Sequence, residues 1–173
     1  GGVKNLKLMR PITPGSTTSY SPDVTFTDQF KNLIKKFKVV RFMDYFFTNS
    51  NPIVNWADRT TPNHSSQDRK MLDEDGVLRS TGGSYEYAIQ LCNETNTDLW
   101  LNIPINASDN YVDNLANLLK TNLNPWLKVY VEFGNEVWNY GLGALAQSFR
   151  NYYWNRSRAS AEVAAGGSPL NYD

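Results

Sequence analysis

The feature that most constrains the fold of this chain is a repeated alternation of strand-like and helix-like segments. Short apolar runs predict strands at residues 3–9, 38–43, 98–103 and 127–133. Apolar residues at helical spacing predict helices over residues 28–37, near 83–95, after Ser108 or Asp109 and after about Gly143. Strands that alternate with helices are typical of a parallel sheet, so the sequence predicts an α/β fold.

The connections between these segments differ in length. Turns from a helix into a strand are short. For example, the helix expected over residues 28–37 ends at Phe37, and the next expected strand begins at Lys38. Loops after strands are longer, and the longest covers residues 44–82. In parallel α/β folds the loops at the carboxyl ends of strands build the functional site. We therefore expect the functional residues at these ends.

The charge balance narrows the choice of partners. Seventeen Lys and Arg residues balance seventeen Asp and Glu residues, so the formal net charge is zero. A neutral chain lacks the basic surface typical of nucleic-acid or anionic-membrane binding. No apolar run approaches the roughly 18 residues that a membrane-spanning helix needs. We expect neither a nucleic-acid partner nor membrane insertion.

The sequence contains few of the residues that form disulfides or bind metals through sulfur or imidazole. Cys92 is the single cysteine, which excludes an internal disulfide framework, and its place on an apolar helical stripe predicts a buried small side chain. His64 is the single histidine, which excludes a histidine-based metal cluster within the chain. We expect no metal and no cofactor.

The strongest motif is the segment Val-Glu-Phe-Gly-Asn-Glu-Val-Trp-Asn at residues 131–139, at the carboxyl end of the fourth expected strand. Its Asn135-Glu136 pair, with Glu132 before it and Trp138 after it, resembles the acid/base motif of clan A glycoside hydrolases. Those enzymes are (β/α)8 barrels that cleave glycosidic bonds with retention, and their Asn-Glu pair ends the fourth strand. Residues 41–44 and Trp56 give a weaker match to such barrels.

The resemblance implies a fold and a domain organisation. A (β/α)8 TIM barrel takes about 250 residues, so this chain would supply about half of one, as four βα units. We expect a partial barrel over residues 1–160 and a tail or linker into further sequence over residues 161–173. An unrelated open α/β domain is the alternative fold.

The resemblance also implies roles for individual residues. Glu136 would be the general acid/base, which requires a raised pKa to keep the carboxyl protonated near neutrality. Asn135 would bind the 2-hydroxyl of the sugar. Expected substrate contacts, from the flanking aromatic residues, the strands and their ends and the long loop, are Trp138, Tyr140, Asn102, Asp44, Trp56, Glu132 and Arg41.

Glu132 is expected inside the site, but not as the nucleophile. Four residues of strand span about 13 Å, whereas the two carboxyl groups of a retaining enzyme lie about 5–5.5 Å apart. We expect Glu132 to pair with Arg41 or Arg10. Glu162, the only glutamate after Glu136, follows in an Ala-rich stretch. The nucleophile is therefore expected outside this segment, or the site has lost it.

Four Asn-x-Ser/Thr sequons suggest a secreted, N-glycosylated protein. They begin at Asn63, Asn93, Asn106 and Asn155. Asn106 follows the third expected strand, so a glycan there would obstruct the expected cleft and favour a non-catalytic role.

Two functions fit these observations. The first is a retaining glycoside hydrolase that acts on a polysaccharide or oligosaccharide, with Glu136 as its acid/base. The alternative is a catalytically silent extracellular glycoprotein with a structural or glycan-binding role, which as a structural protein would be capable of self-assembly.

Overall fold

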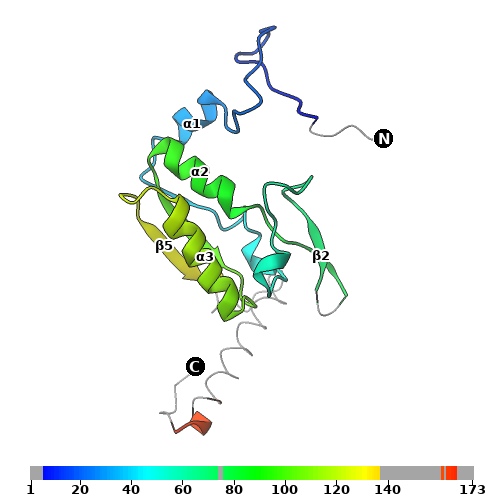
Figure 1. Cartoon of the computed structure of the whole chain (residues 1–173), viewed down its shortest axis with the longest axis vertical. Helices are drawn as coiled ribbons and strands as arrows, with labels where there is room; N and C mark the ends of the chain where they lie inside the picture. Colours follow the sequence, from blue (N-terminus) through cyan, green and yellow to red (C-terminus); the bar gives the residue numbers. More distant parts are fainter. Residues whose placement is uncertain (1–5, 74–75, 137–160, 162, 167–173) are drawn as a thin grey trace.

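A computed structural model of the chain describes residues 6–73, 76–136, 161 and 163–166. Its helices are α1 (Asp28–Ile34), α2 (Tyr85–Thr95) and α3 (Asp109–Asn122), with short 3-10 helices η1 (Thr48–Ser50) and η2 (Trp56–Asp58). Its strands are β1 (Val39–Arg41), β2 (Lys70–Leu72), β3 (Leu78–Ser80), β4 (Asp98–Ile103) and β5 (Val129–Phe133). They form two small sheets, and the fold is a mixed α/β arrangement (Figure 1).

Three strands form a parallel sheet in the order β1–β4–β5. Arg41, Trp100 and Tyr130 occupy one row across it, because Arg41 pairs with Trp100 and Trp100 pairs with Tyr130. Side chains alternate between the two faces of a strand. Asn102 and Glu132, which also pair, therefore point to the same face as this row.

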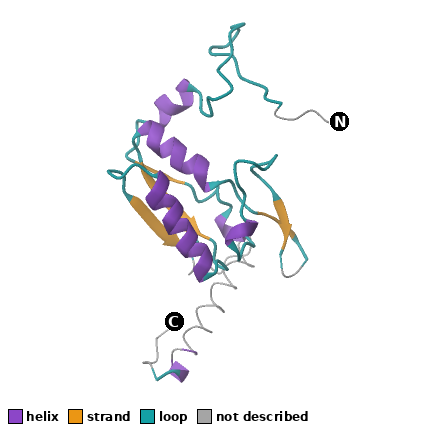
Figure 2. Cartoon of the chain, viewed as in Figure 1, coloured by secondary structure: helices purple, strands orange, loops and turns teal. Residues whose placement is uncertain are grey.

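The opposite face of the sheet carries the hydrophobic core. Leu99 and Leu101 of β4 are almost fully buried there, together with Cys92 of α2 and Tyr111 of α3. Helices α2 and α3 lie over this face (Figure 2). Burial raises the pKa of the Cys92 thiol to about 11, so this side chain is a buried apolar group, as the sequence predicted.

Local sequence sets the ends of the helices. The Ser108 hydroxyl accepts a hydrogen bond from the Tyr111 amide at 3.2 Å, which confirms Ser108 as the N-cap of α3. Helix α2 ends at Thr95, and its C-cap Asn96 has a left-handed backbone with φ 55°, a conformation that asparagine tolerates better than most residues.

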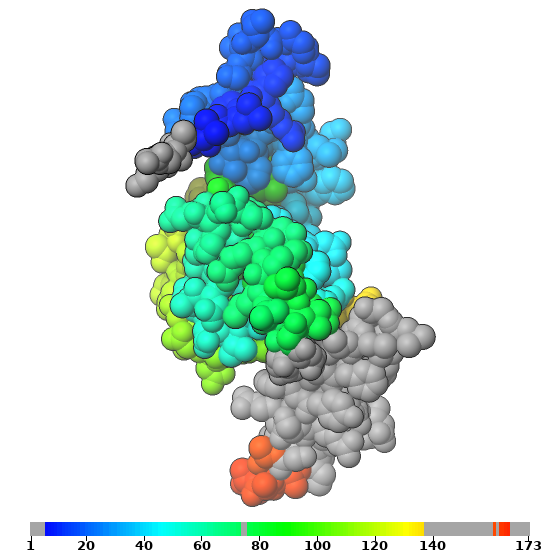
Figure 3. All heavy atoms as spheres, turned by 90° about the vertical axis from the view of Figure 1, so that its right-hand side faces the viewer, coloured from blue at the N-terminus to red at the C-terminus, as the bar shows by residue number. Residues whose placement is uncertain are grey.

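The long loop after β1 holds the antiparallel hairpin β2–β3 and returns to the core at two glycines. Gly82 has a φ of 69°, and a side chain there would overlap the backbone of Phe46. A side chain at Gly83 would overlap the ring of Tyr45. In Figure 3 this loop and hairpin, coloured cyan to green, cover the face turned to the viewer, with the blue N-terminal residues at one end.

The expectation of a partial TIM barrel is wrong. The described residues form one three-stranded parallel sheet and one two-stranded antiparallel sheet, rather than four βα units. Within the expected first strand, residues 6–9 are not a strand, and Leu6 and Leu8 are 86% and 99% exposed. An isolated apolar run gains no burial and no ladder hydrogen bonds, so it does not form a strand.

The resemblance to clan A glycoside hydrolases is contradicted for the same reason. That resemblance depended on placing Asn135-Glu136 after a fourth parallel strand, and the structure makes β5 the third strand of the parallel sheet. The expected helix after Gly143 and the expected domain boundary at residue 160 lie outside the described residues. Within the described ranges, no helix combines the length and apolarity needed to cross a membrane.

Candidate functional site

A polar cluster lies where the parallel strands end. Arg41 ends β1, and its Nη2 donates to Glu132 Oε2 of β5 at 2.8 Å and to Asn135 Oδ1 at 2.7 Å. The Arg41 Nε donates to the same Glu132 oxygen at 3.2 Å. One guanidinium thus connects the first strand of the sheet to the third and to the turn that follows it. Of the two expected partners of Glu132, the structure confirms Arg41.

Two exposed aromatic rings border this cluster on the same face. Trp100 lies between the strands of Arg41 and Glu132, and its Nε1 donates to Glu132 Oε2 at 3.0 Å. The Arg41 guanidinium lies over the Trp100 ring, 5.1 Å from its centroid. Tyr130 lies beside Trp100, with ring centroids 6.3 Å apart. Trp100 and Tyr130 remain 37% and 42% exposed, so both offer apolar surface next to a charged pair.

The turn after β5 is held by two asparagines. Asn102 is fully buried and donates from Nδ2 to the Gly134 carbonyl at 2.7 Å. Asn135 donates from Nδ2 to Asn49 Oδ1 at 2.9 Å, so both ends of its amide are engaged. Glu136 follows in a left-handed conformation with φ 46°, which is uncommon for a residue other than glycine and often marks a functional site.

Glu132 is held in its ionised form. Burial raises its pKa, but hydrogen bonds from Arg41 and Asn102, the charge of Arg41 and the Trp100 indole together outweigh it, so the pKa lies below the usual 4.5. A group with a depressed pKa stabilises the folded state above its usual pKa and loses that contribution as the pH falls. Glu132 is therefore a structural anion near neutrality and not a proton donor.

This direction of shift predicts a specific pH dependence. At pH 7, Glu132→Gln is expected to lower the free energy of unfolding by about 1–3 kcal/mol, since it removes hydrogen bonds to a charged group. The difference from the natural sequence should shrink as the pH falls below 4.5, where the carboxylate becomes protonated. Urea unfolding at a series of pH values measures this difference, and a constant difference down to pH 3 would contradict the role of the ion pair.

The other expected site residues are divided between this region and the rest of the molecule. Asp44 is exposed and lines a cavity of about 190 Å³ together with Asn49, so that cavity adjoins the cluster. Trp56 instead is partly buried and packs against the core, with ring centroids 5.2 Å from Tyr111 and 6.2 Å from Tyr85. The remaining two, Trp138 and Tyr140, lie outside the described residues.

The sequons differ in their surroundings. Asn63 is exposed in the long loop, and Asn106 is half-buried after β4. Asn93 lies on α2, where its Nδ2 donates to the Asn122 carbonyl at 2.8 Å and its Oδ1 accepts from the Asn124 amide. Its amide group therefore supports the packing of α2 against α3. Asn155 lies outside the described residues.

Sequence reasoning missed Trp100, Tyr130 and Asn49. A signal for the first two was present, because residues two apart on a strand share a face. Trp100 is two residues before Asn102, and Tyr130 is two before Glu132. No comparable signal pointed to Asn49, which reaches Asn135 only through the path of the loop after β1.

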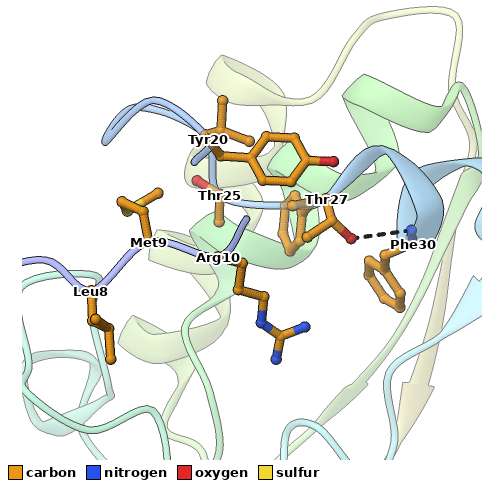
Figure 4. Close-up of a pocket in the computed structure, with 9 residues that line it drawn as sticks. Leu8, Met9, Arg10, Tyr20, Thr25, Thr27 and Phe30 are labelled. Carbon is orange, nitrogen blue, oxygen red and sulfur yellow. Dashed lines mark hydrogen bonds between the residues drawn. The ribbon is translucent and has the colours of Figure 1, made fainter. Parts of the chain in front are cut away.

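A larger cavity lies away from this cluster and contains none of its residues. It measures about 420 Å³ and is formed by the N-terminal segment and the start of α1. Figure 4 shows Arg10, Tyr20, Thr25 and Phe30 around it. Thr27 there accepts a hydrogen bond from the Phe30 amide at 3.3 Å, as the N-cap of α1. Among the residues that the structure describes, no group of three or more His, Cys, Asp or Glu side chains is placed to hold a metal ion.

Comparisons with known proteins give no relative for this chain. No family model matches it, and no match was found among curated proteins or solved structures.

Proposed function

We propose that this chain acts on carbohydrate: it binds a polysaccharide or oligosaccharide over the exposed row of the parallel sheet, and Glu136 serves as the acid/base that cleaves a glycosidic bond. The observation that carries the proposal is the exposed Trp100 ring beside the fixed Arg41–Glu132–Asn135 network. Ligands of open α/β sheets bind at the carboxyl ends of the strands, where this network lies. The Asn-x-Ser/Thr sequons support the further proposal that the protein is secreted.

The surface around Trp100 suits the chemistry of a neutral sugar. A pyranose ring presents apolar C–H groups on its faces and hydroxyl groups at its edge. Trp100 and Tyr130 supply apolar surface of matching size, while Glu132 and Asn135 supply carboxylate and amide groups for the hydroxyls. Arg41 and Glu132 neutralise one another, so the cluster carries no net charge that would require an anionic sugar.

Glu136 is the carboxyl group to which the proposal assigns proton transfer. Glu132 is ionised and engaged by Arg41, so it cannot donate a proton to the leaving oxygen near neutrality. Glu136 is exposed and follows Asn135 directly, at the edge of the cluster. Hydrolysis with retention needs a second carboxylate about 5–5.5 Å from the first. The proposal takes this nucleophile from outside residues 1–173.

Glycan binding without hydrolysis is the second candidate function. It is favoured by the ion pair itself, because the carboxylate closest in sequence to Glu136 is occupied by Arg41. The two candidates share the binding surface and differ in whether Glu136 performs chemistry.

Binding at Trp100 is tested by substitution. Trp100→Ala is expected to weaken binding of an oligosaccharide by about tenfold or more, since a lost contact of about 1.4 kcal/mol corresponds to a factor of ten. Trp126→Ala is the matched control: Trp126 is 67% exposed, and its Nε1 donates to Asn96 Oδ1 rather than to the cluster. Isothermal titration against a panel of neutral oligosaccharides measures both variants. Equal affinities for the natural sequence and Trp100→Ala would refute the proposed surface.

A further inference from the structure

Strand β5 lies at the edge of the parallel sheet but has the apolar composition of a strand that pairs on both sides. β5 ends the order β1–β4–β5, and no strand among the described residues pairs with its outer edge (Figure 1). Its first three residues, Val129, Tyr130 and Val131, are nonetheless apolar or aromatic and are 36%, 42% and 58% exposed. An exposed apolar edge strand with free backbone groups is a template for pairing with another strand.

The hydrogen bonds within the sheet show which backbone groups face this edge. The Lys128 carbonyl accepts from Leu99 of β4, and the Gly134 amide donates to Ile103 of β4. Along a parallel strand, alternate residues direct both backbone groups to the same neighbour. Residues 128, 130, 132 and 134 therefore bond to β4, and Val129 and Val131 direct their N–H and C=O groups outward.

We propose that β5 pairs with β5 of a second copy of this chain, antiparallel and centred on Tyr130. This register places Val129 opposite the second copy's Val131, and Val131 opposite its Val129. Both are hydrogen-bonded pairs, so the outward N–H and C=O groups of the two residues are satisfied. The two chains join their parallel sheets into one mixed sheet, an arrangement that is common in larger sheets.

Two charges select both the occupant and the register: Glu132 on β5 and Lys128, which directly precedes β5. The segment Lys128-Val129-Tyr130-Val131-Glu132 is self-complementary when antiparallel. Lys128 of each copy then lies opposite Glu132 of the other, on the face that carries the two Tyr130 rings. Opposite charges and aromatic residues placed directly across a strand pair stabilise it. A register centred on Val131 instead places Tyr130 opposite Glu132 and leaves Lys128 outside the paired residues. A two-fold dimer places the same surface of both copies in contact, so that surface must be complementary to itself. The segment 128–132 meets this requirement.

Two variants test this pairing by analytical ultracentrifugation of the full chain, from low micromolar to near-millimolar concentration. Val131→Pro removes an outward N–H but no bond to β4, and edge strands tolerate proline at such positions. It is expected to abolish the dimer, with circular dichroism confirming that the chain stays folded. Lys128→Glu places two pairs of like charges across the interface and is expected to raise the dissociation constant about tenfold. Lys36→Glu, an exposed charge reversal outside β5, is the control and should leave it unchanged.

The outcomes separate this inference from the proposed function. A dimer that is weakened by both β5 variants and not by Lys36→Glu supports the pairing. A chain that stays monomeric over the whole range overturns it, as does a dimer that neither β5 variant weakens, since association then uses another surface. The measurement involves no glycan, so it does not depend on carbohydrate binding or hydrolysis.

Discussion

Replacing Leu101 by alanine is expected to lower the free energy of unfolding by about 2–5 kcal/mol, the usual cost of truncating a fully buried leucine. Leu101 is 0% exposed at the centre of β4, the middle strand of the parallel sheet. It belongs to the core that also contains Cys92 of α2 and Tyr111 of α3. The substitution removes its contacts with this core and leaves a cavity that the packed helices cannot fill without moving.

Urea unfolding monitored by circular dichroism measures this loss. Leu78→Ala is the matched control, because Leu78 is also a strand leucine but is 65% exposed, and its truncation is expected to cost less than about 0.5 kcal/mol. Domains of this size are stabilised by only about 5–15 kcal/mol in total. Similar losses of unfolding free energy in Leu101→Ala and Leu78→Ala would show that Leu101 of β4 is not at the centre of the core.

Replacing Glu136 by glutamine is expected to lower the rate of glycoside hydrolysis by about 100- to 10,000-fold, the usual contribution of a positioned general acid/base. Glutamine keeps the size of the side chain and cannot deliver the proton. Oligosaccharide affinity should remain within a few-fold of the original, because Trp100 and the Arg41–Glu132 pair are unchanged. Release of reducing ends from a panel of glycans, measured with the whole protein, tests the prediction.

Glu94→Gln is the control for this experiment, because Glu94 is an exposed glutamate on α2 rather than in the cluster. Unchanged turnover in Glu136→Gln would refute the acid/base role. Binding that depends on Trp100, together with no hydrolysis by the original protein, would instead establish the non-catalytic alternative. Trp100→Ala tests binding and Glu136→Gln tests hydrolysis, so together they distinguish the two candidate functions.

Most of the regular elements could be predicted from local patterns. The expected strand at residues 98–103 matches β4, and the strands expected at residues 38–43 and 127–133 contain β1 and β5. Three of the four expected helices correspond to α1, α2 and α3, and α3 is capped by Ser108, one of its two expected caps. The fourth lies outside the described residues. These elements are encoded within a few residues, by apolar periodicity and by capping side chains.

Other features could not be predicted because they depend on residues distant in sequence. Residues 6–9 have an apolar strand-like pattern but remain outside any strand. The short strands β2 and β3, of three residues each, lie within residues 44–82, which the sequence predicts to be a loop. The expectation of a barrel was wrong for this reason, because the number of strand-like segments does not establish which of them pair.

The candidate site shows the same division. The sequence indicated Asn135, Glu136 and the pairing of Glu132 with a nearby arginine, from the position of the motif after a strand. It did not show that Trp100 donates to Glu132, or that Asn49 holds Asn135 from 86 residues away.

By itself the sequence indicated α1, α2 and α3, the segments that contain β1, β4 and β5, and the polar residues at the ends of these strands, because periodicity and capping act over one or two turns of chain. Only the tertiary structure decided how many strands share a sheet, which face stays open and which side chains meet. Those outcomes depend on burial and hydrogen bonds between segments that are far apart in the sequence, and no local pattern specifies a distant partner.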